Sequence, residues 1–314
     1  MSEYNISIIV PIYNGSEYVR SCYDLLAQQS LDGIEIIFVD DGSSDDTLKK
    51  CIEIEKFNSN FHVYHQENKG VSAARNLGVS MATGKYIGFV DVDDIYEKDM
   101  YESLFNCAKK NNLDIVSMEK IGMQGDLSII DDQKQFLKLF LEKKIRIAVW
   151  NKIYKRSLFR NDTFPNNVQI YEDFRAVYNV ILKASRIGLL NVDKYHYIKR
   201  EGSNSRAGQF EEKYLDAINM VNQVCEKTIE LYPDLEESCE LRKANTYLRI
   251  SKIYYLRKHP KEYKDSIVEM KKWLRKLSIG KAINYFETFD FIRWCLYLYA
   301  FPLFILLIKS IDKE

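Results

Sequence analysis

The sequence predicts an α/β protein with a doubly wound, mainly parallel sheet, followed by a mainly helical C-terminal region. Apolar runs of strand length alternate with helical segments over the first part of the chain. Acidic residues follow two of these runs, at the sheet edge where such folds bind ligands. Beyond Gln209 the apolar positions recur at helical spacing, and prolines separate the segments.

Length and composition limit the classes of protein to consider. The 314 residues suffice for one large domain or two smaller ones with apolar cores, and a hydrophobic content of 46% excludes a disordered chain. Six scattered cysteines without a CxxC pair favour a reducing compartment and no structural zinc. The apolar run at residues 6–12 lacks a preceding basic segment and is too short for a signal peptide.

The chain is expected to begin with a strand, a turn and a helix. Residues 6–10 predict the first strand, which Pro11 should end. Ser16 is a candidate N-cap for a helix over residues 17–29. A strand followed directly by a helix is the first repeat of an alternating α/β fold.

Two adjacent acids stand at the end of the second predicted strand. Residues 34–39 form this strand and run into Asp40 and Asp41. Ser43 or Ser44 should cap the next helix, and the two aspartates after them then fall in its first turn, where acids complement the helix dipole. Asp40 and Asp41 precede that cap, and a carboxylate there can accept a hydrogen bond from a nucleobase N–H.

The alternation continues through two further strands. Residues 61–65 predict the third strand, and residues 71–81 predict a helix that Gly84 should close as C-cap. The apolar run at residues 86–90 predicts a buried strand of a parallel sheet. The alternating order predicts a nucleotide crevice at the carboxyl ends of the strands.

Three carboxylates follow the fourth strand. Asp91, Asp93 and Asp94 should emerge at the sheet edge, because burying unpaired carboxylates is costly. Such acids can hold Mg²⁺ or Mn²⁺ while leaving coordination positions open for substrate phosphates. The alternative is a strand end in which Asp93 or Asp94 caps the next helix.

Four motifs in this region resemble the family-2 glycosyltransferases with the GT-A fold. The resemblance spans roughly residues 4–210, and the motifs keep the order of that family. It implies an inverting transferase that uses a nucleotide-diphospho-sugar and a divalent cation, Mg²⁺ or Mn²⁺. The motifs are PIYN at residues 11–14, VDDGSSDDT at 39–47, NKGVSAARNLG at 68–78 and FVDVDD at 89–94.

The same resemblance implies roles for individual residues. One of two adjacent acids would read the base, the first aspartate of the DxD pair would touch the ribose, and an arginine would lie near the nucleotide. Which acid binds the metal stays open between the three carboxylates. The donor site would comprise Pro11, Tyr13, Asn14, Asp40 or Asp41, Arg75 and Asp91, with Asp93 and Asp94 at the metal.

Glu172 and Asp173 open a predicted helix over residues 171–184. Acids in a first helical turn are ordinarily dipole partners. The resemblance instead implies a catalytic base here, because the family carries it in a Glu-Asp pair after the metal motif. We therefore expect Asp173 to be the general base, with Glu172 beside it.

Two further segments carry candidate ligand contacts. Trp150 could stack on a sugar ring or lie in the core. Residues 195–200 predict an edge strand leading into a loop rich in glycine and serine. By resemblance, Arg200, Ser203 and Arg206 would close over the diphosphate; a solvated turn is the alternative.

The C-terminal third is expected to be helical and basic. Residues 213–231, 235–258 and 263–277 predict three helices. Between residues 241 and 281 there are 13 Lys or Arg against 3 Asp or Glu, a local charge of +10. Such asymmetry suggests that the two parts of the chain face different partners.

An apolar segment follows at residues 289–308. Its uninterrupted part, residues 294–308, contains Pro302 and is shorter than the roughly 20 residues that span a bilayer. An interfacial segment, helped by basic helices that attract anionic lipids, is the favoured interpretation. A helix packed on protein or a partner interface is the alternative.

The sequence thus predicts a catalytic domain at residues 1–210 and a helical region at residues 211–314. The expected protein is cytoplasmic and peripheral on the inner membrane face, and transfers a sugar from a UDP-sugar to a lipid-linked or growing glycan of a capsule or exopolysaccharide. No nucleic-acid partner is expected, and homo-oligomerisation stays open. The alternatives are a polyprenyl-phosphate sugar synthase and a catalytically silent scaffold of a glycan-assembly complex.

Overall fold

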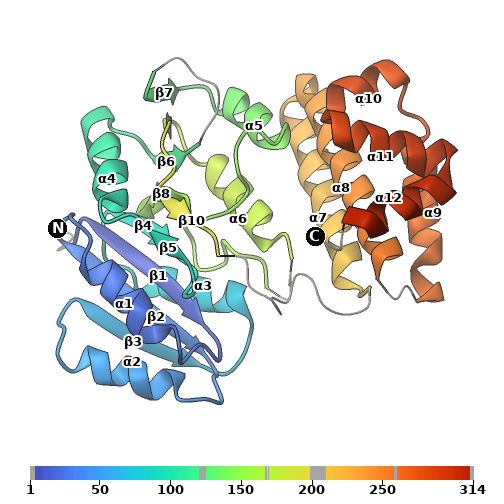
Figure 1. Ribbon diagram of the computed structural model, residues 1–314. Helices are drawn as coiled ribbons and strands as arrows, with labels where there is room; N and C mark the ends of the chain where they lie inside the picture. Colours follow the sequence, from blue (N-terminus) through green and yellow to red (C-terminus); the bar gives the residue numbers. More distant parts are fainter. Residues whose placement is uncertain are drawn as a thin grey trace. The chain divides into compact units, whose positions relative to one another are not determined.

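The structure is a computed structural model that describes residues 4–119, 125–166, 168, 170–198, 210–257 and 260–311. It divides into two compact units, Met1–Lys199 and Arg200–Glu314. The first unit contains the sheets, and the described part of the second is helical (Figure 1).

The first unit is built on one mixed sheet of eight strands in the order β3-β2-β1-β4-β8-β6-β9-β7. The first four are parallel, as predicted. Strand β8 then runs antiparallel to both β4 and β6, and β7 antiparallel to β9, so the second half of the sheet is mixed, with β6 and β9 as its parallel pair. The strands are β1 Ile6–Ile12, β2 Ile34–Asp41, β3 Phe61–Gln66, β4 Tyr86–Phe89, β6 Ile115–Met118, β7 Leu127–Ile130, β8 Lys152–Lys155 and β9 Ile187–Leu190.

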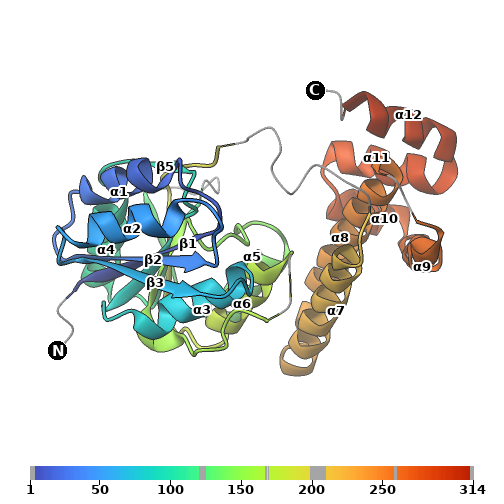
Figure 2. The ribbon, with the colours of Figure 1, turned by 90° about the horizontal axis from the view of Figure 1, so that it is seen from below.

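Helices cover both faces of this sheet (Figure 2). Alternate residues of β1, including Ile8 and Val10, share an apolar core with α1, α2 and α4. Helix α3 packs on the opposite face, where a Cβ on Gly78 would lie 2.4 Å from Cγ2 of Ile9, so glycine allows the close approach. The helices are α1 Val19–Ala27, α2 Thr47–Glu55, α3 Val71–Met81, α4 Met100–Asn111, α5 Gln133–Leu141, the short η1 Arg156–Leu158 and α6 Glu172–Ile181.

Two predicted element ends near the site are wrong. Strand β1 continues through Pro11, which pairs with Val39 of β2. This is tolerated because the pairing of β1 with β4 has already ended at Ile9, so the missing N–H lies outside that ladder. Gly84 is not a C-cap: an added Cβ would lie 2.5 Å from the Ser7 nitrogen, so it serves close backbone packing.

A second, two-stranded sheet joins distant parts of the first unit. Strand β5, Ile95–Tyr96, pairs antiparallel with β10, Tyr195–His196. His196 lies 3.0 Å from Glu97 through Nε2, which gives it a local structural partner. The pairing places residues after β10 against the acidic motif that precedes β5.

The second unit is formed by helices that include the predicted apolar segment. That segment forms two helices, α11 and α12, which meet at Ala300. Trp294, Tyr297 and Phe304 are buried, and the ring centroids of Tyr297 and Phe304 are 5.0 Å apart. Within the described residues, no helix is both long and apolar enough to cross a membrane. The helices are α7 Lys213–Leu231, η2 Pro233–Leu235, α8 Glu236–Leu256, η3 Lys261–Tyr263, α9 Lys264–Leu274, α10 Ile279–Tyr285, α11 Thr288–Tyr299 and α12 Phe301–Ile311.

Candidate active site

The acids predicted at strand ends lie at one edge of the sheet. Strand β2 ends at Asp41, and Asp91 follows β4 by two residues. Since β2, β1 and β4 are parallel neighbours, their carboxyl ends meet at the same edge. The sheet therefore brings the candidate base-reading and metal-binding acids onto one side of the molecule.

Asp41 holds the loop that leads into α3. Its carboxylate accepts hydrogen bonds from Nε2 of Gln66 at 2.7 Å, from the Lys69 N–H at 2.9 Å and from the Gly70 N–H at 2.8 Å. Gly70 has a φ of 87°, a conformation that favours glycine. These bonds give Asp41 a structural role in the present geometry.

Asp40 has a different environment. Its Oδ2 lies 2.7 Å from Nδ1 of His65 and accepts a longer bond, 3.4 Å, from the Ser43 N–H. Its Oδ1 is buried and has no hydrogen-bond partner in the part of the chain that the structure describes. A buried acceptor without a partner is costly, which makes Oδ1 a candidate to receive an N–H donor from a ligand.

The PIYN turn is tied to the loop after β2. Asn14 adopts a φ of 49°, its N–H donates to Oγ of Ser43 at 2.9 Å, and its Oδ1 accepts from the Ser44 N–H at 2.8 Å. These contacts replace the predicted capping of α2, which begins only at Thr47 without a side-chain cap. Tyr13 beside them is 54% exposed and free to meet a ligand.

Asp45 completes this connection. It accepts hydrogen bonds from the Ser16 N–H at 3.1 Å and the Thr47 N–H at 3.0 Å. Helix α1 begins only at Val19, with Tyr18 in the N-cap position, so the predicted N-cap at Ser16 is wrong. Burial raises the pKa of Asp45, but the bonds from Thr47 and Ser16 outweigh it and lower the pKa to about 2. The loops after β1 and β2 are thereby fixed to each other at the carboxyl ends of these strands.

Arg75 lies at the centre of a cluster of three carboxylates. It projects from α3 and is almost fully buried. Its Nη1 donates to Asp173 at 2.7 Å and Glu172 at 3.3 Å, and its Nη2 donates to Asp91 at 3.3 Å. Burial lowers the pKa of Arg75, but the three acids together raise it, so the guanidinium is a permanent cation here.

The cluster joins both predicted parts of the reaction centre, with Asp91 after β4 and Asp173 in the first turn of α6. Burial raises the pKa of Asp173 to about 6, although Arg75 opposes the shift. Burial likewise raises the pKa of Asp91 against the opposing charge of Arg75. A carboxylate with a pKa near neutrality can accept and release a proton at physiological pH.

Asp94 is held by the second sheet. It is buried, its Oδ2 accepts from the Tyr195 hydroxyl at 2.7 Å, and its Oδ1 accepts from the Ile198 N–H at 3.0 Å. Burial raises the pKa of Asp94 to about 6. A cation at Asp94 would have to share oxygens already engaged in these bonds.

The donor set fits a hard divalent cation in one respect. Mg²⁺ commonly uses one or two carboxylates together with substrate phosphates. Asp93 and Asp91 can supply those carboxylates beside the sheet edge. No group of three or more His, Cys, Asp or Glu side chains among the described residues is arranged as a complete protein cage.

Trp150 packs against Tyr195, the hydrogen-bond partner of Asp94. Its ring stacks on Tyr195 with a centroid distance of 4.2 Å and an interplanar angle of 15°. The guanidinium of Arg146 lies 5.7 Å from the Trp150 ring centroid. One face of the indole is therefore used by protein, which favours the core alternative over a free sugar platform.

Some predicted residues cannot be placed, and others were missed. Arg200, Ser203 and Arg206 lie outside the described residues. Tyr195, the partner of Asp94, had no predicted role, because only the pairing of β5 with β10 reveals it. Glu119 and Lys152 are buried, and the sequence predicted no role for either side chain.

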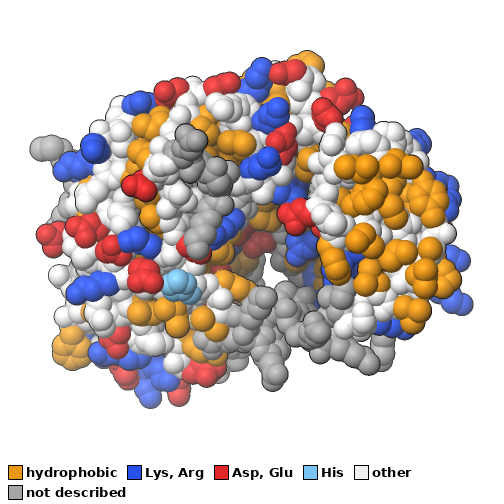
Figure 3. All heavy atoms as spheres, turned by 45° about the horizontal axis from the view of Figure 1, so that its top comes forward, with side chains coloured by type: hydrophobic (Ala, Val, Ile, Leu, Met, Phe, Trp, Pro, Cys, Tyr) orange, Lys and Arg blue, Asp and Glu red, His pale blue; other side chains and the backbone are white. Residues whose placement is uncertain are grey.

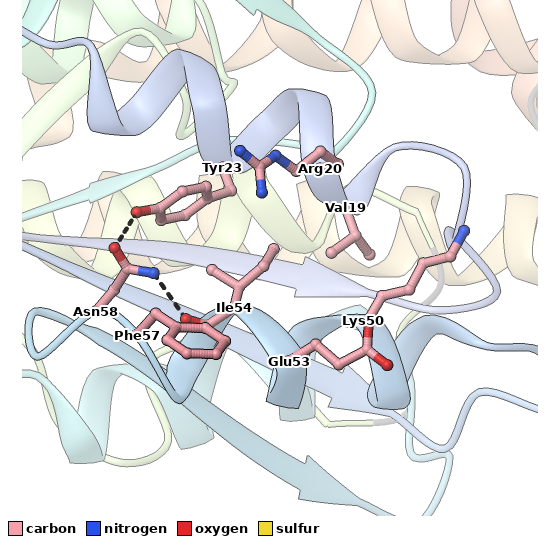
Figure 4. A pocket seen from close by; sticks show the side chains of 8 residues that line it. All are labelled: Val19, Arg20, Tyr23, Lys50, Glu53, Ile54, Phe57 and Asn58. Atoms are coloured by element: carbon pink, nitrogen blue, oxygen red, sulfur yellow. Dashed lines mark hydrogen bonds between the residues drawn. The ribbon is translucent and has the colours of Figure 1, made fainter.

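Two surface hollows lie apart from this cluster. One, of about 440 Å³, lies between α1 and α2 and is drawn in Figure 4. There Phe57 is 86% exposed, and the Tyr23 hydroxyl donates to Oδ1 of Asn58 at 2.5 Å. The other, of about 400 Å³, is in the second unit and includes Tyr247 and Trp273. Neither contains a carboxylate of the Arg75 cluster.

Comparison with known proteins assigns the family. A family model described as "Glycosyl transferase family 2" matches residues 7–179, more than half of the chain. The chain belongs to glycosyl transferase family 2. The matched residues include every member of the Arg75 cluster but end before Tyr195.

A relative found by sequence comparison supports the family assignment. EpsH of Bacillus subtilis, described as a putative glycosyltransferase, is 33% identical over 207 residues, covering 61% of this chain and 60% of EpsH. The chain therefore matches only about three fifths of that relative's length.

The fold is shared with solved structures. Residues 1–349 of S. aureus TarS, in complex with UDP-GlcNAc, match with a TM-score of 0.66 and 20% identity over 98% of this chain and 90% of that chain. The mannosyltransferase PcManGT from Pyrobaculum calidifontis, in complex with GDP-Man and Mn²⁺, matches with a TM-score of 0.54 and 15% identity over 99% and 88%. At these identities the likeness establishes the GT-A-type fold alone.

Proposed function

We propose that this protein is an inverting glycosyltransferase that transfers a sugar from a UDP-sugar to a lipid-linked or growing polysaccharide acceptor. The observation that carries the proposal is the Arg75 cluster, in which one guanidinium holds Asp91 of the donor side and Asp173 of the acceptor side. A single displacement at the anomeric carbon needs those two functions side by side.

Recognition of the nucleobase of the sugar donor is assigned to Asp40. Its buried Oδ1 has no partner in the described residues, whereas the Asp41 carboxylate already accepts three hydrogen bonds. Uracil offers an N3–H donor, and an ionised carboxylate is an acceptor only. The UDP-GlcNAc in TarS is consistent with a uridine donor.

Asp93, with Asp91, is proposed to hold Mg²⁺ or Mn²⁺, as supported by the Mn²⁺ in PcManGT. When bound, the cation would supply charge stabilisation to the departing diphosphate. Asp94 has a separate task in this proposal, because its bonds to Tyr195 and Ile198 fix the backbone that carries the two ligands.

Asp173 is proposed to accept the proton of the acceptor hydroxyl as that oxygen attacks the sugar. The bond from Nη1 of Arg75 fixes one carboxylate oxygen at 2.7 Å, and the proton transfer is assigned to the other oxygen. Glu172 shares the same Nη1 at 3.3 Å and adds negative charge near the base. Positioned proton transfer of this kind contributes roughly 10²–10⁴ in rate.

A panel of nucleotide sugars tests the proposal. We expect UDP-sugars to be hydrolysed slowly by the protein alone and transferred faster when an undecaprenyl-diphosphate-linked glycan is added, with EDTA suppressing both reactions. If none of the nucleotide sugars is hydrolysed or transferred, the transferase assignment is wrong. If activity and donor affinity are the same in EDTA, the metal assignment is wrong.

The product distinguishes the two other candidate functions. A polyprenyl-phosphate sugar synthase would use the same donor site but would add the sugar to a phosphate, giving a lipid monophosphate sugar. A catalytically silent scaffold would bind UDP without turnover. The intact Asp91 and Asp173, both bonded to Arg75, favour an active enzyme over a scaffold.

The second unit is proposed to contact the cytoplasmic face of a membrane through α11 and α12. One side of these helices buries Trp294 and Phe304, while Leu303 and Leu306 on α12 are 55% and 66% exposed. Figure 3 shows hydrophobic side chains gathered on a face of this unit, with Lys and Arg at its margin. Lys309, exposed in the last turn of α12, and other exposed basic residues add charge complementarity to anionic lipid.

A further inference from the structure

A buried ion pair lies beside the candidate base but does not touch it. Lys152 of β8 is 0% exposed, and Glu119, which follows β6, is also buried. The Lys152 Nζ lies 3.6 Å from Oε1 of Glu119. Charged residues are seldom buried unless they are paired, so this pair requires an explanation.

Lys152 uses its ammonium group to hold the segment of residues 146–151. It donates to the carbonyl oxygen of Arg146 at 2.8 Å, to that of Ala148 at 2.9 Å and to Oδ1 of Asn151 at 2.6 Å. An ammonium group has three protons, and these three acceptors match that number.

Glu119 holds the same segment by accepting hydrogen bonds from N–H groups of the segment. Its Oε1 accepts from the Arg146 N–H at 3.1 Å and from Nδ2 of Asn151 at 3.0 Å. The same oxygen also accepts from the Ser117 hydroxyl at 2.8 Å, which anchors Glu119 to β6. Residues 146–151 are therefore fixed by both charges of the pair.

The held segment contacts the reaction centre at two points. The backbone N–H of Val149 interacts with the Asp173 carboxylate and lowers the pKa of that group. Trp150 stacks on Tyr195, whose hydroxyl donates to Asp94. The segment thus links the candidate base to the acidic motif after β4 by a path that is independent of Arg75.

Stability alone does not account for the pair. Replacing a buried ion pair by apolar residues of similar volume is often neutral or stabilising, because the desolvation of two charges offsets their attraction. An apolar pair could not, however, bind two carbonyls and one N–H of the same turn. The directional bonds are what the two charges add.

We propose that Lys152 and Glu119 are positioning residues for the transfer reaction. They fix residues 146–150 so that the Val149 N–H orients Asp173 while Trp150 holds Tyr195 against Asp94. This inference rests on the proposed function of Asp173 as the base, and it predicts a loss of turnover without loss of donor binding.

Lys152→Met tests the inference, with Lys155→Met as the matched control. Lys155 lies on the same strand, but its Nζ pairs with Asp114 at 3.2 Å, outside the held segment. For Lys152→Met we expect kcat per UDP-binding site to fall about 10²-fold, since small misplacements of reacting groups have effects of this size. The Kd for UDP, measured by calorimetry, should stay unchanged, and the control should behave as wild type.

Amide hydrogen exchange gives a second measurement that does not depend on activity. Exchange at residues 146–150 should accelerate in Lys152→Met, while exchange in α3 and β1 stays protected. Glu119→Gln keeps the shape of the side chain and one acceptor oxygen, so it should accelerate exchange at residues 146–150 less than Lys152→Met does. If Lys152→Met does not fold, Glu119→Gln tests the positioning role in its place.

The outcomes separate the two proposals. If wild type transfers sugar and Asp173→Asn does not, but Lys152→Met and Glu119→Gln keep wild-type kcat, the positioning role is wrong and the proposed function stands. If wild type transfers nothing, the proposed function is wrong, and unchanged exchange at residues 146–150 would overturn the positioning role as well.

Discussion

At the scale of single residues, the site depends on one buried cation and the acids that share it. Arg75 bonds Asp91, Glu172 and Asp173 from positions far apart in the chain. Two of these acids have raised pKa values because burial outweighs the attraction of the guanidinium. Arg75 therefore orients the base, while burial of the cluster brings the pKa of Asp173 toward neutrality.

Asp173→Asn should lower kcat by roughly 10²–10⁴ while leaving the Kd for UDP nearly unchanged, because a general base acts in the transition state. Steady-state kinetics and calorimetry measure the two quantities. Glu172→Gln is the matched control and should retain most of the turnover. Loss of turnover in Glu172→Gln with wild-type kcat in Asp173→Asn would assign the base to Glu172 instead.

The pH dependence of kcat/KM should report the ionisation of Asp173. Only the ionised carboxylate can accept a proton, and burial raises its pKa to about 6, so activity should decline as the pH falls below about 6. The charge of Glu172 raises this pKa further, and Glu172→Gln should therefore move the acid limb to lower pH. A limb that stays in place would belong to another group, such as Asp94.

Asp40→Asn and Asp41→Asn should have different effects, although the residues are adjacent. Asp40→Asn should weaken UDP binding and lower the melting temperature less than Asp41→Asn does, since the one amide oxygen of asparagine can still accept the bonds that Oδ2 receives from His65 and Ser43. Asp41→Asn should lower the melting temperature, because one amide oxygen cannot replace a carboxylate that accepts three bonds. Isothermal calorimetry and thermal unfolding measure the two properties; the reverse pattern would exchange the assignments.

At the scale of secondary-structure elements, the sequence predicts the presence of helices and strands better than their capping and their neighbours in the sheet. The apolar period gives α3 at residues 71–81 and α7 at residues 213–231 with their observed limits. The predicted cap at Ser16 is wrong because residues 16–18 form a turn and α1 begins only at Val19. Asp45, 29 residues away, binds that turn at the Ser16 N–H, a contact that no local pattern contains. Strand β8 enters antiparallel for the same reason: its neighbours are decided by tertiary packing.

The candidate site shows the same limit of prediction. Motif positions indicate the acids at the ends of β2 and β4, because strand ends and carboxylates are local features. They do not reveal that Arg75 bonds Asp173, 98 residues later in the chain, or that Tyr195 bonds Asp94 across 101 residues. Those contacts follow only from the assembled sheets.

Gly78→Ala tests the close packing of α3 on the sheet. The new methyl group would meet Cγ2 of Ile9 at 2.4 Å, so the variant should be destabilised by about 1–3 kcal/mol despite the better helix propensity of alanine. Gly280→Ala in α10 is the control, since nothing lies within 4 Å of its added Cβ. Denaturant unfolding should show a loss of stability for the first variant and none for the second.

At the scale of the whole molecule, the two units differ in charge and in surface. The segment at residues 241–281 has a charge of +10 in a chain of zero net charge, and exposed apolar residues follow on α11 and α12. The buried side of those helices shows that part of the apolar segment belongs to the core of the second unit. The exposed side is what remains for the proposed lipid surface.

Vesicle flotation tests that surface. Wild type should float with phosphatidylglycerol vesicles, less with phosphatidylcholine vesicles, and should partly resist elution by high salt, because insertion and charge both contribute. Leu303→Glu with Leu306→Glu should elute in salt, whereas Phe57→Glu, a change of an exposed apolar residue in the first unit, should not. If wild type stays unbound and the double variant disrupts a dimer, the face is an oligomer interface.

The bond between Tyr195 and Asp94 also fixes the order in which this protein can mature during synthesis. A ribosome that has released about 150 residues has produced all four parallel strands and every donor-side acid, but neither α6 nor β10. Contacts over such sequence separations close late, because the intervening loop loses entropy before the contact forms. The nascent chain can thus form the parallel half of its sheet, β1 to β4, before β8 and β9 are synthesised. The acidic motif after β4 reaches its final geometry only when Tyr195 is present.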